Sequence, residues 1–212
     1  MDFSNIHKIN INSKTTINLL SYNDFDPYDF EKDLLPIEFN RLKSIQHEVK
    51  QREFVATRML RNSIFGKDEI TYDSIGAPHI GARKYISISH TTDIVGIAIS
   101  DFKIGFDLEP IRAKAIKLFP KFLHEEELAI FDTKSELEMT MAWSAKETLY
   151  KLAGRKEIIF KDDLRLHKEG DNWVGTIHNP DAIIHVPLRV FDSGHNVLTI
   201  NSDPIEIESR NI

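Results

Sequence analysis

Residues 104–109 read Ile-Gly-Phe-Asp-Leu-Glu and place two carboxylates at a spacing that suits cation binding. The alternation of residue types predicts a β-strand with one apolar face and one acidic face. The apolar face consists of Ile104, Phe106 and Leu108. On the other face Gly105 leaves room beside Asp107 and Glu109, whose side chains lie about 6.5 Å apart on a strand. One oxygen-seeking divalent cation can bridge two such acids, although a solvated acidic strand is the alternative.

A second segment, residues 141–154, predicts a helix that ends at Gly154 and has two contrasting sides. Its apolar stripe consists of Met141, Ala145, Leu149 and Leu152. The opposite arc combines an indole, two ammonium groups and a third carboxylate, contributed by Trp143, Lys146, Lys151 and Glu147. Beside the acidic strand, this arc predicts a site with three acids for a divalent ion and lysines for phosphate. A solvated face with ordinary charge pairs is the alternative.

The two segments closely resemble the signature motifs of the 4′-phosphopantetheinyl transferases. The first is Ile-Gly-Phe-Asp-Leu-Glu at residues 104–109, and the second is Trp-Ser-Ala-Lys-Glu-Thr-Leu-Tyr-Lys at residues 143–151, about forty residues further on. The length of 212 residues resembles the larger, surfactin-synthetase-activating type. That type implies an α+β fold, a pseudo-dimer of two similar α/β lobes packed with the site between them. We expect the lobes at residues 1–102 and 103–212.

The resemblance also implies an activity. The family transfers the 4′-phosphopantetheine arm of coenzyme A to a serine of an apo acyl or peptidyl carrier protein and releases adenosine 3′,5′-bisphosphate. Asp107, Glu109 and Glu147 would hold Mg²⁺, which prefers carboxylate, phosphate and water oxygens. Lys151 would face the transferred phosphate, and Lys146 would do likewise or pair with an acid. Glu147 is the family's usual candidate for the base that takes the serine proton.

Upstream residues complete the implied coenzyme A site. Arg58 follows Ala-Thr on a predicted long helix, residues 36–65 closed by Gly66, and would meet a phosphate of coenzyme A. Ser89 and His90 end a predicted strand in a Ser-x-Ser-His pattern, whose histidine the family uses against the pyrophosphate. Two structural alternatives remain. Arg58 would cover the edge of the core with its stem, and His90 would be a satisfied core histidine.

The sequence departs from the family pattern at Ala77, where Gly-Ala-Pro replaces the usual Gly-Lys-Pro. The family's lysine reaches substrate phosphate, so this contact is absent or is supplied by Lys67, Arg83 or Lys84. A non-catalytic module that binds coenzyme A and a partner is therefore the alternative function. A metal-dependent phosphohydrolase also needs three acids, but it gives no role to the Ser-His strand or the arginine helix.

Composition limits the class of protein. The 41% hydrophobic and 28% charged residues are typical of a globular domain, and a net charge of −6 argues against a general nucleic-acid binder. No apolar stretch approaches the roughly 20 residues of a membrane span, and the first residues lack the pattern of a signal peptide. The absence of cysteine excludes disulfides and thiolate sites and suits the cytoplasm. Two lobes in one chain favour a monomer, because smaller relatives form the site between subunits.

The remaining segments carry weaker patterns. A lysine stripe formed by Lys114, Lys117 and Lys121 predicts a solvated helix face or a docking stripe for an acidic carrier protein, although Pro120 limits regular helix there. Alternating residues predict strands at 164–167, 173–177, 183–188 and 197–200. The first dozen residues and the tail after Ser202 are expected to be loosely held.

Overall fold

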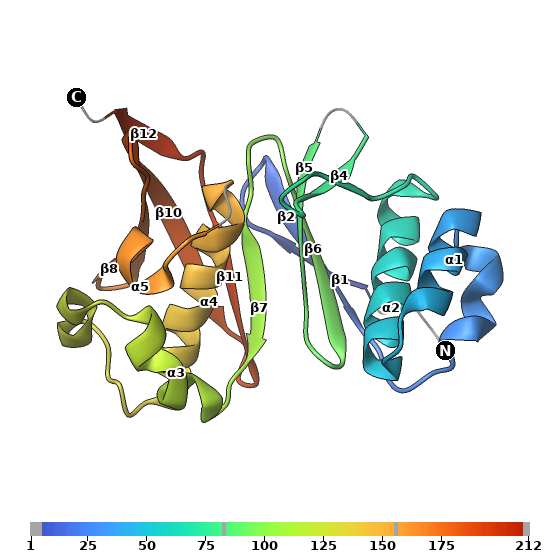
Figure 1. The fold of residues 1–212 in the computed structure, drawn as a ribbon, viewed down its shortest axis with the longest axis horizontal. Coiled ribbons are helices and arrows are strands. Elements are labelled where there is room, and N and C mark those ends of the chain that lie inside the picture. Colours follow the sequence, from blue (N-terminus) through green and yellow to red (C-terminus); the bar gives the residue numbers. More distant parts are fainter. Residues whose placement is uncertain (1–5, 82–83, 155–156, 210–212) are drawn as a thin grey trace. The chain divides into compact units, whose positions relative to one another are not determined.

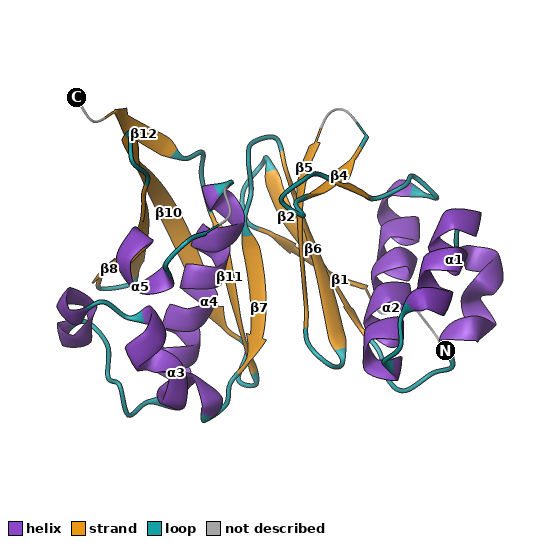
Figure 2. Ribbon diagram, in the orientation of Figure 1, coloured by secondary structure: helices purple, strands orange, loops and turns teal. Residues whose placement is uncertain are grey.

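The structure, a computed structural model, describes residues 6–81, 84–154 and 157–209. The chain divides into two compact units, Met1–Asp101 and Phe102–Ile212. Each unit combines a six-stranded antiparallel sheet with helices packed on one face of that sheet (Figures 1 and 2). This mixed architecture confirms the predicted α+β fold class.

The N-terminal unit is organised around a sheet with the strand order β1-β2-β6-β5-β4-β3. The strands are β1 (Ile6–Asn10), β2 (Thr15–Ser21), β3 (Thr71–Tyr72), β4 (Pro78–Ile80), β5 (Lys84–His90) and β6 (Ile94–Ser100). A 3₁₀ helix, η1 (Pro27–Asp33), precedes two α-helices. The second of these helices contacts β2 and β6, and its Ala56 and Leu60 join Leu20, Val95 and Ile97 in the buried core.

The predicted helix over residues 36–65 is wrong in one respect, because the chain breaks it into α1 (Pro36–Ser44) and α2 (Glu48–Phe65). Ile45 adopts an extended conformation with φ −82° and ψ 121°. Its carbonyl accepts a hydrogen bond of 2.8 Å from the side chain of Gln51. That bond takes the place of a helical partner, so the chain turns here and the second helix begins on a new axis.

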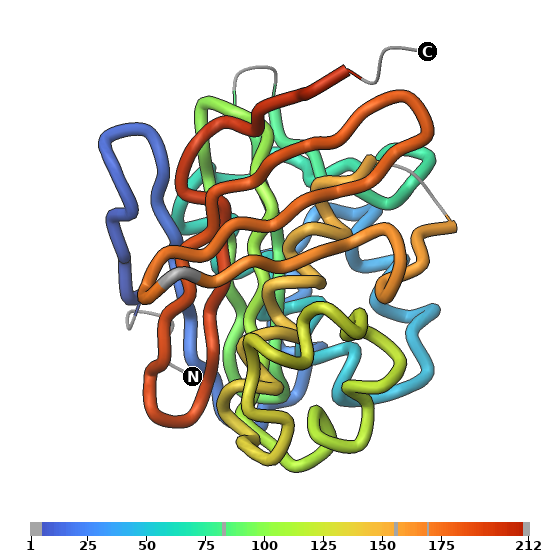
Figure 3. The backbone as a smooth tube through the Cα atoms, turned by 90° about the vertical axis from the view of Figure 1, so that its left-hand side faces the viewer, coloured from blue at the N-terminus to red at the C-terminus, as the bar shows by residue number. Residues whose placement is uncertain are grey.

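The C-terminal unit carries a sheet with the strand order β7-β11-β10-β9-β8, and β12 also pairs with β10. The strands are β7 (Phe106–Pro110), β8 (Leu164–Glu169), β9 (Asn172–His178), β10 (Ala182–Asp192), β11 (Asn196–Asn201) and β12 (Glu206–Ser209). The hairpins of this sheet are the orange-to-red tubes in Figure 3. Its helices are α3 (Lys114–Phe122), which contains Pro120, η2 (Glu125–Ala129), α4 (Glu136–Ala153) and α5 (Phe160–Asp163).

Two segments that were expected to be loose form strands. Strand β1 pairs with β2, and β12 pairs with residues 182–185 of β10. Each is four or five residues long, and β12 is exposed along its whole length. Their order comes from backbone hydrogen bonds to a longer neighbour, for which an apolar sequence pattern gives little signal.

Helix α4 is the central helix of the C-terminal unit. It contacts α3 and the strands β7, β8, β9, β10 and β11. Three residues of its predicted stripe, Ala145, Leu149 and Leu152, are fully buried. Trp173 and Val186 of the sheet lie in the same core. Neither α4 nor another helix of the described ranges is long and apolar enough to cross a membrane.

Gly105 allows α4 to contact the backbone beside β7 directly. A Cβ atom at this position would lie 2.5 Å from the carbonyl oxygen of Thr148 and 2.9 Å from Cγ of Leu152. The room that Gly105 leaves beside the acids is therefore filled by α4. The close approach instead brings the acids of β7 against the polar side chains of α4.

We expect Gly105→Ala to lower the free energy of unfolding by about 2–3 kcal/mol, because the new methyl group meets a helix backbone atom. Urea denaturation measures this change. Gly175→Ala is the matched comparison, because its Cβ would meet the side chain of Leu149, which can shift, rather than backbone. A Gly105→Ala variant as stable as the wild type would contradict the close contact.

Candidate active site

Polar side chains of β7 and α4 contact one another. The later residue of the strand contacts the earlier residue of the helix, and the earlier residue of the strand contacts the later residue of the helix. Near one end, Nε1 of Trp143 donates a hydrogen bond of 3.0 Å to Oε1 of Glu109. Toward the other end, Nζ of Lys151 lies 2.9 Å from Oδ1 of Asp107 and donates to the carbonyl of Phe106 at 2.6 Å. Glu147 projects from the turn of α4 between Trp143 and Lys151. The contact thus unites the acids and the lysine that the sequence predicts for the site.

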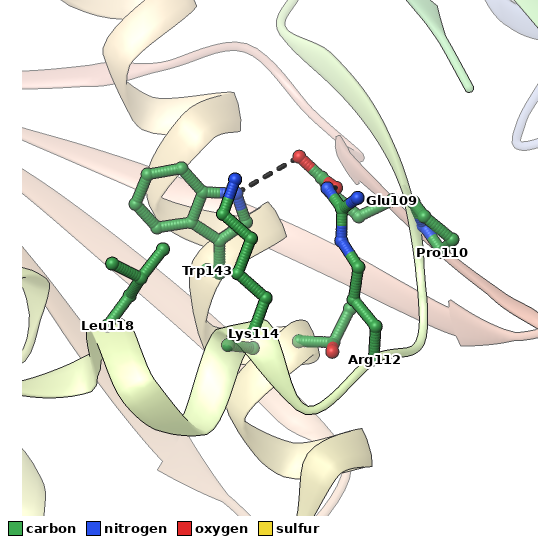
Figure 4. Close-up of a pocket in the computed structure, with 8 residues that line it drawn as sticks. Glu109, Pro110, Arg112, Lys114, Leu118 and Trp143 are labelled. Atoms are coloured by element: carbon green, nitrogen blue, oxygen red, sulfur yellow. Dashed lines mark hydrogen bonds and ion pairs between the residues drawn. The ribbon is translucent and has the colours of Figure 1, made fainter. Parts of the chain in front are cut away.

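Glu109 lies beside a small pocket that Figure 4 shows. The pocket encloses about 150 Å³ and is lined by residues of β7, α3 and α4, including Lys114, Leu118 and Trp143. Nη2 of Arg112 lies 3.2 Å from Oε2 of Glu109. Burial, and secondarily the charge of Asp107, raise the pKa of Glu109, although Trp143 and Arg112 oppose this change.

Glu147 is the most strongly perturbed acid of the site. Burial first, and then the negative charge of Asp107, raise its pKa to about 7, while Lys151 acts in the opposite direction. The ring of Phe160 stacks on Trp143 and on Tyr150, with centroid distances of 5.5 and 5.3 Å. Trp143 and Tyr150 lie on the same side of α4 as Glu147.

The three carboxylates fit a hard cation by their chemistry. Negative charge on Asp107 raises the pKa of both Glu109 and Glu147, so each acid destabilises its neighbours' ionised forms. A divalent cation would remove this repulsion. Within the described ranges, however, the structure gathers no group of three or more His, Cys, Asp or Glu side chains that could hold a metal ion. The three-ligand set therefore remains a prediction.

Lys146 does not lie at this site, which corrects the expectation that it binds phosphate of coenzyme A. Its side chain is fully buried, and Nζ lies 2.6 Å from Oε2 of Glu127. It also donates to the carbonyls of Leu164 and Phe160 at 2.7 and 3.3 Å. Burial lowers its pKa to about 8 although Glu127 opposes that change. Around the helix axis, Lys146 lies about 60° from Trp143 on the side away from Glu147 and about 60° from the buried Leu149, so it points toward the core side of the arc.

The acid partner of Lys146 ties several segments together. Glu127 of η2 accepts hydrogen bonds of 2.6 Å from the backbone N–H groups of His124 and Leu166, in addition to the lysine. A single buried ion pair thereby joins η2, α4 and β8. This pairing is the second of the two roles that the sequence left open for Lys146.

The N-terminal unit contains the other predicted site residues. Arg58 is 7% exposed, and its Nε lies 3.5 Å from Oε1 of Glu38 while its guanidinium covers the ring of Phe54. This placement favours the structural alternative for Arg58. Ser89 is buried near the end of β5, and the side chain of His90 is 40% exposed. A phosphate contact by these three residues remains a prediction.

The turn around Ala77 is well defined. Its N–H donates to Oδ1 of Asp73 at 2.9 Å. Of the residues that could replace the missing lysine, Lys67 donates to the carbonyl of Lys32, and Lys84 is paired with Asp101. Arg83 lies outside the described residues.

Sequence reasoning missed three partners of the predicted site residues. Trp143 and Arg112 bind the carboxylate of Glu109, and Glu53 lies against His90. Arg112 had a local signal, because it lies three residues after Glu109. The other two contacts join segments far apart in the chain, and no spacing in the sequence indicates them.

Comparisons with known proteins place the site in a family. Residues 103–198 match the family model of the 4′-phosphopantetheinyl transferase superfamily. The segment contains both β7 and α4. The chain is also 30% identical over 98 residues to the 4′-phosphopantetheinyl transferase gsp of Aneurinibacillus migulanus, an alignment that covers 44% of this chain and 39% of that relative. The match thus spans well under half of the relative's length.

Residues 103–198 are thus similar to the 4′-phosphopantetheinyl transferase superfamily. This result confirms the family that the two signature motifs predict.

The perturbed pKa of Glu147 predicts pH-dependent stability. The carboxyl titrates near 4.5 in the unfolded chain and near 7 in the fold, so the folded state binds the extra proton between these values. Stability should therefore fall as the pH rises from about 5 to about 7, by roughly 2 kcal/mol in total. Urea unfolding at several pH values, with a chelator present, measures the slope.

In Glu147→Gln the titrating group is absent, so this slope should be much smaller. Glu136→Gln is the matched control, because Glu136 is exposed in the first turn of the same helix. A Glu147→Gln variant that kept the wild-type slope would assign the pH dependence to another group.

The buried pair of Lys146 and Glu127 predicts a large cost for removing one partner. Lys146→Met leaves a buried carboxylate without its cation and should cost about 3–5 kcal/mol, whereas the double variant with Glu127→Gln should recover part of this loss. Lys84→Met, which removes an exposed ion pair, should cost less than about 1 kcal/mol. Equal losses of stability in Lys146→Met and Lys84→Met would contradict this prediction.

Proposed function

We propose that this protein transfers the 4′-phosphopantetheine arm of coenzyme A to a serine hydroxyl of an apo acyl or peptidyl carrier protein. The observation that carries the proposal is the contact between β7 and α4, which joins both signature segments around three carboxylates and a lysine. The superfamily match to residues 103–198 and the activity in the name of the relative support it.

The reaction exchanges one P–O bond for another. The serine oxygen attacks the phosphorus that carries the pantetheine arm, and the bond from this phosphorus to the adenylate part of coenzyme A breaks. Adenosine 3′,5′-bisphosphate leaves with the electron pair, and the serine proton passes to a base. Such a transfer depends mainly on positioning and charge neutralisation.

Lys151 is suited to neutralise the phosphate that moves. Its side chain is 27% exposed, so substrate can reach it. The carbonyl of Phe106 and the carboxylate of Asp107 hold its ammonium group in place. A cation fixed before substrate binds loses little freedom during the reaction.

The three acids would hold Mg²⁺, which when bound supplies positive charge that orients the pyrophosphate and stabilises the leaving group. Trp143 and Arg112 fix the carboxylate of Glu109 by their contacts with its two oxygens. We also assign the serine proton to Glu147, which is the family's usual candidate for the base and whose carboxylate belongs to the same group of acids.

The carrier would approach the lysine stripe of α3, whose three lysines are exposed. Carrier proteins of acidic character would associate faster with this surface than neutral ones. The lack of cysteine suits action in the cytoplasm, and we propose that the protein acts as a monomer.

The alternative is a non-catalytic module that binds coenzyme A. Ala77 favours it, because the family's phosphate-binding lysine is missing there. The described structure still unites Asp107, Glu147 and Lys151 at one contact, whereas a module without catalysis has no need of them.

The first test is the intact mass of an apo carrier protein after incubation with this protein, coenzyme A and Mg²⁺. We expect a gain of one phosphopantetheine arm that a chelator prevents. Binding of coenzyme A without any mass gain, across several carriers, would favour the non-catalytic module. Free phosphopantetheine without a modified carrier would indicate a hydrolase.

Asp107→Asn and Glu147→Gln should each slow the transfer about 100-fold or more, while circular dichroism shows an intact fold. Glu136→Gln, which changes one exposed acid of the same helix, should transfer at the wild-type rate. Wild-type turnover in both Asp107→Asn and Glu147→Gln would contradict the roles assigned to these acids.

A further inference from the structure

The carboxylate of Glu109 is held at both of its oxygens. Nε1 of Trp143 donates to Oε1 at 3.0 Å, and Nη2 of Arg112 donates to Oε2 at 3.2 Å. The side chain of Glu109 is 20% exposed, so water reaches only part of the carboxylate. A partly buried carboxylate is costly unless donors and a cation compensate its charge. Arg112 therefore serves as the counter-cation of Glu109.

The backbone around Arg112 is fixed, whereas its side chain extends into solvent. The N–H of Ile111 donates to the carbonyl of His195 at 2.9 Å, and the carbonyl of Arg112 accepts from the N–H of Ala115 at 3.1 Å. The side chain of Arg112 is 52% exposed, and Figure 4 shows it at the pocket beside Glu109. Rotation of this side chain alone can therefore separate the guanidinium from the carboxylate, while β7 and α3 stay in place.

The other cation of the site is held by more contacts. Nζ of Lys151 donates to Oδ1 of Asp107 and also to the carbonyl of Phe106. For the guanidinium of Arg112, the contact with Glu109 is the one hydrogen bond or ion pair that the described residues provide. Of the two cations, Arg112 is thus the one that leaves its acid with the smaller loss of contacts.

A divalent ion at Glu109 competes with this contact. The ion and the guanidinium are both attracted to the same pair of oxygens, and two cations on one carboxylate repel each other. The charge-assisted hydrogen bond of Arg112 is lost when the guanidinium moves away, and this loss weakens the net binding of the ion.

We propose that Arg112 is an internal competitor of the divalent ion at Glu109. Its guanidinium compensates the carboxylate until the ion binds, and it then rotates into solvent. Arg112 thereby raises the ion concentration at which the site fills. The proposal rests on the proposed function, which assigns a divalent ion to Glu109.

The competition has a structural consequence for the acids. Asp107 and Glu109 lie two residues apart on one face of β7, where like charges repel. Lys151 compensates the first acid and Arg112 the second. The acids therefore stay at the contact with α4 without help from an ion, but the site binds the ion more weakly than uncompensated acids would.

The test compares wild type with Arg112→Met and Arg112→Lys, and uses Mn²⁺ as the probe. Mn²⁺ binds the carboxylate and water oxygens that also suit Mg²⁺, and electron paramagnetic resonance measures its free concentration. Methionine keeps an unbranched stem but has neither charge nor donors, so we expect Arg112→Met to bind Mn²⁺ about tenfold more tightly. Arg112→Lys should lie between the two, because lysine keeps the charge but lacks the planar fork of donors.

Lys114→Met is the matched control. Lys114 lines the same pocket and carries the same charge, but no ion pair with Glu109 is found for it among the described residues. Its removal should change the affinity for Mn²⁺ much less than the removal of Arg112. An unchanged affinity in Arg112→Met would overturn the proposal, and so would equal gains in Arg112→Met and Lys114→Met.

The motion of the guanidinium gives a second readout. Nitrogen NMR relaxation measures the order of the Arg112 side chain, and Arg112→Met identifies its signal. Saturating Mg²⁺ should make this signal more mobile in wild type, whereas in Glu109→Gln it should be mobile with or without the ion. A signal that stayed rigid with Mg²⁺ bound would contradict the displacement of Arg112.

The outcomes separate this proposal from the proposed function. If Mn²⁺ bound equally well to wild type and Glu109→Gln, or bound neither wild type nor Arg112→Met, the ion would not be a ligand of Glu109 and the competition would be refuted. If the Mn²⁺ results were as expected but no carrier gained the phosphopantetheine arm, the proposed transfer would fail and the role of Arg112 would stand.

Discussion

The candidate site depends on one close contact between a strand segment and a helix. Gly105 has no side chain, so the backbone of α4 at Thr148 can approach it. That approach brings Asp107 and Glu109 next to Glu147 and Lys151. It also buries much of the three carboxylates. The raised pKa values of Glu109 and Glu147 follow from this burial and from the proximity of like charges. Packing of α4 against Gly105 thus stabilises the fold, while the same contact destabilises the ionised forms of Glu109 and Glu147.

A second interaction fixes the rotation of α4 about its axis. The buried pair of Lys146 and Glu127 binds the helix to η2 and β8. Neighbouring residues on a helix point about 100° apart, so a fixed Lys146 also fixes the direction of Glu147. The motif therefore contains two charged neighbours with different tasks: the lysine anchors the helix, and the glutamate faces the acids of β7.

Patterns in the sequence predict the fold class, the strands β8, β9, β10 and β11 of the C-terminal sheet and the grouping of Asp107, Glu147 and Lys151. They fail where backbone geometry or distant partners decide. The break at Ile45 depends on the side chain of Gln51, and the short strand β12 depends on hydrogen bonds to β10. The sequence placed Lys146 on the polar side of α4, although its side chain is buried. Helical angles predict the side of the helix on which a residue lies, but not how far the surrounding core extends.

The acids of the site and their supporting contacts all lie in the C-terminal unit. The described hydrogen bonds of the β7–α4 contact, the pair of Lys146 and Glu127 and the aromatic stack of Phe160 join residues after position 102. Substitutions in the N-terminal unit, for example at Ala77, can therefore leave these contacts of the C-terminal unit unchanged. The sequence of the N-terminal unit can thus diverge while the contacts that hold the acids together within the C-terminal unit are kept.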